Sequence, residues 1–189
     1  TVPVINGLDN FEHPCQIMAD LLTVKERFGK LKGIKMAYVG DGNNVCNSLM
    51  LGCAMVGMDL VCGCPKGYEP DKEITKVAKK IAKKNGCLLK IVESAKEAAK
   101  GADVVYTDVW VSMGQEEESR LREQIFKPYQ VNAELMSVAS KNAIVMHCLP
   151  AHRGMEITDE VIDSERSVVL DQAENRLHAQ KAIMVTLMS

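Results

Sequence analysis

A carboxylate, a hydroxyl and a large aromatic side chain gather directly after an apolar stretch of the chain. Residues 102–107 are apolar and rich in β-branched side chains, which predicts a buried strand. Asp108 ends this run, and Trp110, Ser112 and Met113 follow in a segment rich in polar residues and glycine. Open α/β sheets bind their ligands at the carboxyl ends of such strands. An Asx turn would explain Asp108 alone, but the whole segment is too polar for a core and predicts a loop that closes over a ligand.

His13 and Gln16 form a second polar group, placed where a helix is expected to begin. Pro14 suits the first turn of that helix, and Gly29 marks its end after Phe28. The positive end of a helix dipole favours an anion or a carbonyl oxygen as ligand. The alternative is a histidine cap that binds no ligand.

A third group, Gly-Asp-Gly-Asn-Asn at residues 40–44, follows an expected strand at 34–39. It matches part of a dinucleotide-binding motif, but the third glycine is missing and no acidic residue ends the next strand. Dinucleotide binding is therefore a minor hypothesis. The side-chain amide of Asn43 or Asn44 offers a donor and an acceptor near a helix N-terminus, which suits a carboxylate ligand. A simple Asn cap is the alternative.

These groups are positioned by a regular alternation of strand and helix patterns. We expect strands at residues 34–39, 58–62, 88–92, 102–107, 143–147 and 167–170, and a further strand and turn at 1–7. We expect helices at 12–28, 44–56, 72–84, 94–101, 117–125 and 132–140, after Thr158, and from 173 to the end. The alternation predicts an α/β fold, a doubly wound, mostly parallel sheet with helices on both faces. Residues 40–44, 108–114 and 147–150 would then share one edge of the sheet.

Composition and charge narrow the class of protein. The 189 residues are 47% hydrophobic and 25% charged, as in an ordinary soluble globular domain. The formal net charge of −2 argues against a nucleic-acid partner. No membrane-spanning run and no signal peptide is evident. Seven scattered cysteines, without the second close pair that a zinc site needs, predict free thiols in a reducing cytoplasm and no metal.

Five short motifs, in this order and spacing, resemble those of the ornithine carbamoyltransferases. They are His-Pro-Cys-Gln at 13–16, Gly-Asp-Gly-Asn-Asn at 40–44, Asp-x-x-x-Ser-Met-Gly at 108–114, His-Cys-Leu-Pro at 147–150 and Glu-Asn-Arg at 174–176. Each motif is modest alone, but the series spans essentially the whole chain and is highly specific. The resemblance implies a Rossmann-like α/β domain.

The resemblance implies that one group of residues contacts carbamoyl phosphate. His13 and Gln16 would contact its carbamoyl group, and His13 would polarise the carbonyl as negative charge develops on the oxygen. Cys148 and the backbone carbonyl of Leu149 would lie beside the reacting carbon and its amide nitrogen. Arg176, from the last helix, would lie nearby.

A second group is implied to hold L-ornithine. Asn44 and the backbone N–H of Met113 would hold the α-carboxylate, while Asp108 and Ser112 would hold the α-ammonium. Asp108 and Cys148 would also orient the attacking side-chain nitrogen, which must lose a proton because its reference pKa is about 10.4. The loop that contains Ser112 and Met113 would close over ornithine and exclude water.

The implied reaction is carbamoyl transfer from carbamoyl phosphate to the side-chain amine of L-ornithine, giving citrulline and phosphate without a cofactor or metal. Residues 1–30 would be an inter-domain junction and residues 31–189 the ornithine-binding domain. The N-terminal carbamoyl-phosphate domain is absent from this chain, since the family's Ser-Thr-Arg-Thr phosphate loop has no counterpart here. We expect the fragment to be inactive alone and the complete enzyme to be a homo-oligomer.

Two alternatives remain open at this point. A putrescine carbamoyltransferase also uses a free amine, although Asn44, Ser112 and Met113 only make sense for a ligand with an α-amino-acid head. A non-catalytic amino-acid-binding module is the alternative from another class of protein. An aspartate-specific member would be expected to lack the motif at 108–114.

Overall fold

The computed structural model describes residues 2–111 and 119–189 of the chain. Ser112 and Met113 lie outside these ranges, and so does most of the loop expected to close over a ligand.

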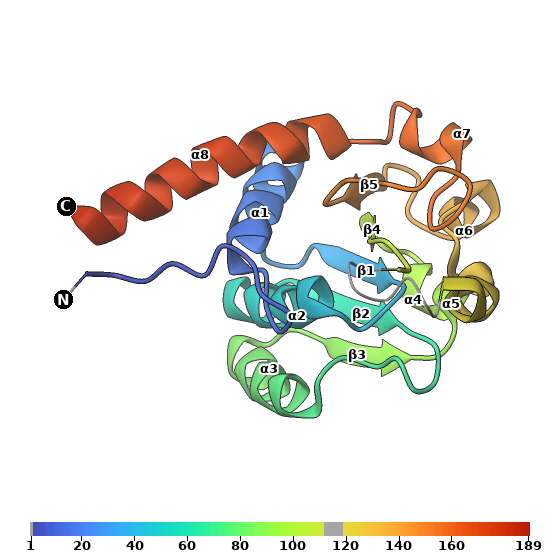
Figure 1. The fold of residues 1–189 in the computed structure, drawn as a ribbon, viewed down its shortest axis with the longest axis horizontal. Helices are drawn as coiled ribbons and strands as arrows, with labels where there is room; N and C mark the ends of the chain where they lie inside the picture. The colour runs from blue at the N-terminus through green and yellow to red at the C-terminus, as the bar shows by residue number, and fades with distance from the viewer. Residues whose placement is uncertain (1, 112–118) are drawn as a thin grey trace.

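The fold is a five-stranded parallel sheet with helices on both faces, which confirms the expected α/β class (Figure 1). The strands are β1 (Lys35–Val39), β2 (Asp59–Gly63), β3 (Leu89–Val92), β4 (Val104–Thr107) and β5 (Ile144–His147), in the order β3-β2-β1-β4-β5. The helices are α1 (Pro14–Phe28), α2 (Asn44–Val56), α3 (Lys72–Asn85), α4 (Ala95–Ala99), α5 (Ser119–Phe126), the 3₁₀ helix η2 (Lys127–Tyr129), α6 (Ala133–Ser137), α7 (Asp159–Ile162) and α8 (Val169–Met188).

Alternate residues of each strand feed two separate cores. In β1, Met36 and Tyr38 pack toward α1, α2 and α3, whereas Ala37 and Val39 pack toward α4, α6 and α7. This is the period-two alternation of a strand that is buried on both faces. The sheet is therefore covered by helices on either side, and its strand ends are the place where polar loops can gather.

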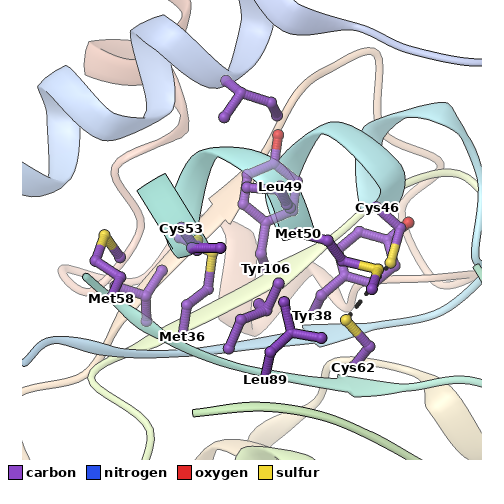
Figure 2. Close-up of a cluster of buried hydrophobic side chains, with 14 of the residues drawn as sticks. Met36, Tyr38, Cys46, Leu49, Met50, Cys53, Met58, Cys62, Leu89 and Tyr106 are labelled. Atoms are coloured by element: carbon purple, nitrogen blue, oxygen red, sulfur yellow. Dashed lines mark hydrogen bonds between the residues drawn. The ribbon is translucent and has the colours of Figure 1, made fainter. Parts of the chain in front are cut away.

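Sulfur-bearing side chains fill much of the core between α2 and the sheet (Figure 2). All seven cysteines fall in the described ranges and are free thiols. The sulfur atoms of Cys46 and Cys62 lie 3.6 Å apart, and burial raises the pKa of Cys46. Cys46, Cys53 and Cys62 thus act as small apolar side chains in the core.

Two expected strands are wrong. The run Ser-Val-Val-Leu at 167–170 was expected to be a strand, but only Ser167 makes an isolated bridge, to Val145, and α8 begins at Val169. Val168 packs into one core and Val169 into the other, so a short β-branched run serves as the turn into a helix. Residues 2–9 form no strand or helix.

The C-terminal half of α8 projects past the rest of the domain, on the same side as the N-terminal segment (Figure 1). Both carry exposed apolar side chains, among them Val4, Leu8, Val185 and Met188. Within the described ranges, no helix is long and apolar enough to cross a membrane.

Candidate functional site

The site lies where the strand order changes direction. The chain moves from β1 to β2 and β3 on one side of the sheet, then returns to β4 and β5 on the other. The carboxyl ends of β1 and β4 are neighbours, and the chain leaves them toward opposite faces of the sheet. Open α/β sheets bind their ligands at such a position. Residues 40–44 and Asp108 both follow these strand ends, as the sequence indicated.

Gly42 allows the loop after β1 to lie directly on another stretch of backbone. Its N–H donates to the carbonyl of Tyr68 at 2.8 Å. A Cβ added at Gly42 would lie 2.2 Å from the backbone nitrogen of Pro70, so no other residue fits without moving the loop. This contact holds the two asparagines that follow at the start of α2.

Asn43 and Asn44 have different partners. Asn43 caps α2, because its Oδ1 accepts from the N–H groups of Val45 and Cys46, and its Nδ2 donates to Asp108 Oδ2 at 2.7 Å. Asn44, the residue implied to hold a carboxylate, donates instead to the backbone carbonyl of Asp9 at 2.7 Å. The structure thus brings Asn43 to Asp108, and Asn44 to the N-terminal segment.

Cys148 is the second partner of Asp108. Its thiol donates to Asp108 Oδ1 at 2.9 Å, and burial, together with the nearby carboxylate, raises the pKa of Cys148 well above its usual value. The thiol is therefore protonated at neutral pH. Asp108 itself is buried, and its Oδ1 also accepts from the Val109 N–H at 2.8 Å.

His147 lies closer to Cys148 than strand alternation would suggest. Adjacent side chains of a strand point in opposite directions, but β5 ends at His147, and Asp108, His147 and Cys148 bring ligand-type atoms within 4.8 Å of one another. The imidazole is nevertheless fully engaged elsewhere. His147 Nδ1 accepts from the Leu149 N–H at 2.9 Å, and Nε2 faces the buried Glu156 carboxylate at 3.2 Å. These bonds fix the backbone of Leu149, which has a left-handed φ of 56°.

His13, Gln16 and Arg176 contribute polar atoms that lack partners. His13 Nδ1, Gln16 Oε1 and Arg176 Nε are buried, and none has a hydrogen-bond partner in the described parts of the chain. Burial, and then the charge of Arg176, lower the pKa of His13, while Asp108 raises it. The lowered pKa favours a neutral imidazole at His13. Buried polar atoms without partners are rare, and they indicate a position for a polar ligand.

Trp110 is part of the core and does not belong to a closing loop, contrary to the sequence-based expectation. It is 3% exposed and stacks on Phe126, with ring centroids 6.3 Å apart. Arg122 of α5 donates to the Trp110 carbonyl at 2.6 Å and forms a buried ion pair with Asp41. Its guanidinium also lies 5.0 Å from the ring centroids of Tyr68 and Phe126. Arg122 thereby ties the loop after β1 to the loop after β4.

The sequence matches a known family over most of its length. Residues 32–187 match the family described as aspartate/ornithine carbamoyltransferase, Asp/Orn binding domain. This chain belongs to that family. The agreement covers every strand and α2 to α8, and so includes the loops that hold Asp108 and Cys148 and the part of α8 that holds Arg176.

Individual relatives agree with the family match. The chain is 60% identical over 187 residues to an ornithine carbamoyltransferase of Carboxydothermus hydrogenoformans, covering 99% of this chain and 60% of that protein. The structure of ornithine carbamoyltransferase from Pyrococcus furiosus superposes with a TM-score of 0.96 at 54% identity, over 100% of this chain and 60% of the other. The corresponding protein of Gloeobacter violaceus gives 0.92 at 53% identity, over 99% and 62%. The chain thus spans about 60% of the length of the curated relatives it matches.

Several residues around the site were missed by sequence reasoning. Arg122 stands in a charged helix, where a solvated side chain is the usual interpretation. Glu156 and Asp20 are acidic residues whose neighbours in the sequence are apolar, and both are fully buried. The sequence offered one signal that could have identified Asp20. It is a carboxylate on the apolar face of the helix expected at 12–28, one turn after Gln16.

We predict that Arg122→Met destabilises the domain more at pH 7.5 than at pH 5. Burial already raises the pKa of Asp41 despite the nearby guanidinium. A raised pKa means that the contribution of Asp41 to stability is present below its unfolded pKa and is lost as pH rises through its folded pKa. Removing Arg122 leaves this carboxylate without its cation, which costs about 3–5 kcal/mol when it is ionised.

Urea denaturation at both pH values measures the effect. Arg120→Met, on the exposed side of the same helix, is the matched control and should change stability by less than about 0.5 kcal/mol. A loss of the same size at pH 5 and 7.5 would contradict the assigned role of Asp41.

Proposed function

We propose that this chain is the ornithine-binding part of an ornithine carbamoyltransferase. The observation that carries the proposal is the proximity of two half-sites. Asp108 and Cys148 form an anionic site suited to an amine, and the unpartnered atoms of His13, Gln16 and Arg176 form a site suited to a carbamoyl group. His13 lies close enough to both for the charge of Arg176 to lower its pKa and that of Asp108 to raise it. An amine and a carbamoyl donor bound in this way would face each other.

The residues suit the chemistry of carbamoyl transfer. The ornithine side-chain nitrogen attacks the carbamoyl carbon, the bond from that carbon to the phosphate oxygen breaks, and the proton lost by nitrogen goes to phosphate. Neutral His13 donates a hydrogen bond to the carbonyl oxygen as it gains negative charge. Cys148 and the Leu149 carbonyl orient the nitrogen atoms at the reacting carbon. This chemistry uses side chains and backbone groups of the protein and requires no cofactor.

The α-amino-acid head of ornithine supplies the specificity. Asp108 and Ser112 hold its ammonium, and Asn44 with the Met113 N–H holds its carboxylate. In the absence of ligand, Asn43 Nδ2 occupies one oxygen of Asp108, so the ammonium takes a place beside this amide or displaces it. Asn44 must exchange its bond to Asp9 for the bond to the carboxylate.

The complete enzyme includes more than this chain. We infer that residues 1–30 form an inter-domain junction and that residues 31–189 form the ornithine-binding domain. We infer that a carbamoyl-phosphate domain outside this sequence supplies the residues that bind the phosphate. The exposed apolar side chains of the α8 end and of residues 2–11 support the proposal that they cover another part of the protein. We further propose that the complete enzyme is a homo-oligomer in the cytoplasm.

We predict that the chain binds L-ornithine at least tenfold more tightly than putrescine or L-aspartate. Putrescine lacks the α-carboxylate, and aspartate lacks the side-chain amine, so each forfeits a charged contact worth about 1.5–3 kcal/mol. Calorimetric titration with the three ligands measures the difference. Equal affinity for putrescine would favour a putrescine carbamoyltransferase, and binding of none of them would contradict the assignment of the Asp108 site.

In the complete enzyme, we predict that Asp108→Asn lowers kcat/KM by about 30- to 150-fold while the fold is retained. The variant loses one charged contact, worth roughly 2–3 kcal/mol. Steady-state citrulline formation measures the change, and thermal unfolding checks the fold. Asp103→Asn, directly before β4 and so at the end of the strand opposite to Asp108, is the control. Near wild-type turnover by a folded Asp108→Asn enzyme would show that another group holds the ammonium.

This chain alone is predicted to form no measurable citrulline. Charge-assisted bonds to phosphate would be largely absent, and holding both reactants at attack distance is worth roughly 7–11 kcal/mol of the barrier. The assay uses both substrates, first with this chain and then after addition of a separately prepared carbamoyl-phosphate domain. Turnover before that addition would mean that this chain binds the phosphate itself. A catalytic domain should gain activity on addition, whereas an amino-acid-binding module should not.

A further inference from the structure

Asp20 of α1 is a fully buried carboxylate that links three elements near the carbamoyl half-site. Its Oδ1 accepts from Gln16 Nε2, one turn earlier on α1, at 2.9 Å, and from Gln172 Nε2 of α8 at 2.7 Å. Gln172 Nε2 also lies 3.1 Å from the hydroxyl of Tyr106 on β4. Both amides are 0% exposed, so water cannot replace these bonds.

The hydrogen-bond partners fix which way each amide faces. The His147 N–H can only donate, and it donates to Gln172 Oε1 at 2.9 Å, so the NH₂ group of Gln172 must face Asp20. An ionised carboxylate can only accept, and therefore the NH₂ group of Gln16 faces it as well. Gln16 Oε1 then points away from Asp20 and, throughout the described ranges, has no hydrogen-bond partner.

We propose that Asp20 is a positioning residue that holds the Gln16 amide with its oxygen free to accept a hydrogen bond from the carbamoyl NH₂ group. This inference rests on the proposed function and adds a residue to it. The same network reaches the other side of the carbamoyl group, since Gln172 accepts from the His147 N–H and His147 accepts from the Leu149 N–H. One carboxylate thus connects the two segments that face the reacting carbon.

Asp20 must be ionised to act in this way. Burial raises the pKa of Asp20 to about 7, although its bonds to Gln16, Gln172 and Tyr106 and the charge of Arg176 oppose the shift. Below that pH, the Gln16 amide can flip, because the protonated carboxyl can donate to its oxygen and so compete with the substrate. We therefore expect kcat/KM for carbamoyl phosphate to fall as pH drops through about 7.

The neighbouring titratable groups on other elements do not titrate in this range. They are Tyr106 on β4, Cys148 after β5 and Cys53 on α2, and burial raises the pKa of each, so they remain neutral near pH 7. Arg176 on α8 is the one cation facing Asp20 in this network. His13, at the start of α1, has a lowered pKa and is already neutral. Of these groups, Asp20 is thus the one whose pKa lies near 7.

Asp20→Asn in the complete enzyme tests the proposal. Asparagine keeps the size and one acceptor oxygen but has no charge, so kcat/KM should fall about tenfold at pH 8 and the acid limb near pH 7 should disappear. Stability should not fall at pH 8. A raised folded pKa means that the contribution of Asp20 to stability is lost as pH rises through about 7, and asparagine avoids that loss.

A second variant moves the titration without touching Gln16. Gln172→Met removes a donor that lowers the pKa of Asp20, so the acid limb should move to higher pH. Thr23→Val is the matched control, because Thr23 is buried on α1 one turn after Asp20 and accepts from Asn175 of α8 at 3.0 Å. It should lower stability but leave the pH profile and kcat/KM within about twofold.

The outcomes separate this inference from the proposed function. If the wild-type enzyme forms no citrulline, the proposed function fails and the role of Asp20 fails with it. If the wild type is active but Asp20→Asn keeps its kcat/KM and its acid limb, only the positioning role is overturned. An equal loss in Thr23→Val would likewise overturn it, since the effect would then come from helix packing.

Discussion

Parallel pairing of β1 with β4 is the interaction on which the site depends. The register pairs Met36 with Val104 and Tyr38 with Tyr106, so the two strands end side by side. The next pairing, of β4 with β5, places Thr107 opposite His147 and brings the following Cys148 beside Asp108. Because strand side chains alternate between faces, a shift of one residue would send Asp108 toward the wrong layer. The geometry of the site is thus a consequence of sheet register.

Buried carboxylates fix the orientation of the polar side chains around the candidate site. Each has a different kind of partner on at least one oxygen: Asp41 the guanidinium of Arg122, Asp108 an amide and a thiol, Asp20 two amides, and Glu156 an imidazole. The second oxygen of Asp20 and that of Glu156 have no hydrogen-bond partner in the described chain. Removing a charge from water is costly, so such groups persist only where their partners are held in place. The reverse also holds, because a carboxylate that can only accept dictates how neighbouring amides and imidazoles face. The polar layer therefore orients the groups that would meet a ligand.

The two ends of the chain complete the site by packing on each other. α1 and α8 are far apart in sequence but lie side by side (Figure 1), with Asp20–Gln172 and Thr23–Asn175 contacts between them. His13 and Gln16 on α1, and Arg176 on α8, keep buried polar atoms free of partners in the described chain. A folded protein tolerates such atoms where a ligand satisfies them. The helix pair therefore supplies one half of the candidate site, and the strand ends supply the other.

Local sequence determined the helices and strands and the position of the site at one edge of the sheet. Apolar periodicity, the proline after His13 and the glycine after Phe28 act within a few residues, so α1 and the strand ends could be predicted, with Asp108 and Cys148 on one edge. Only the tertiary structure decided which residues contact one another in the site. That Asn43 reaches Asp108, that Trp110 packs in the core and that Asp20 binds Gln172 of α8 depend on contacts between residues many positions apart, which no local pattern encodes. The strand expected at 167–170 was wrong for the same reason: a β-branched run suits a strand or the start of a helix equally, and packing against two cores made the choice.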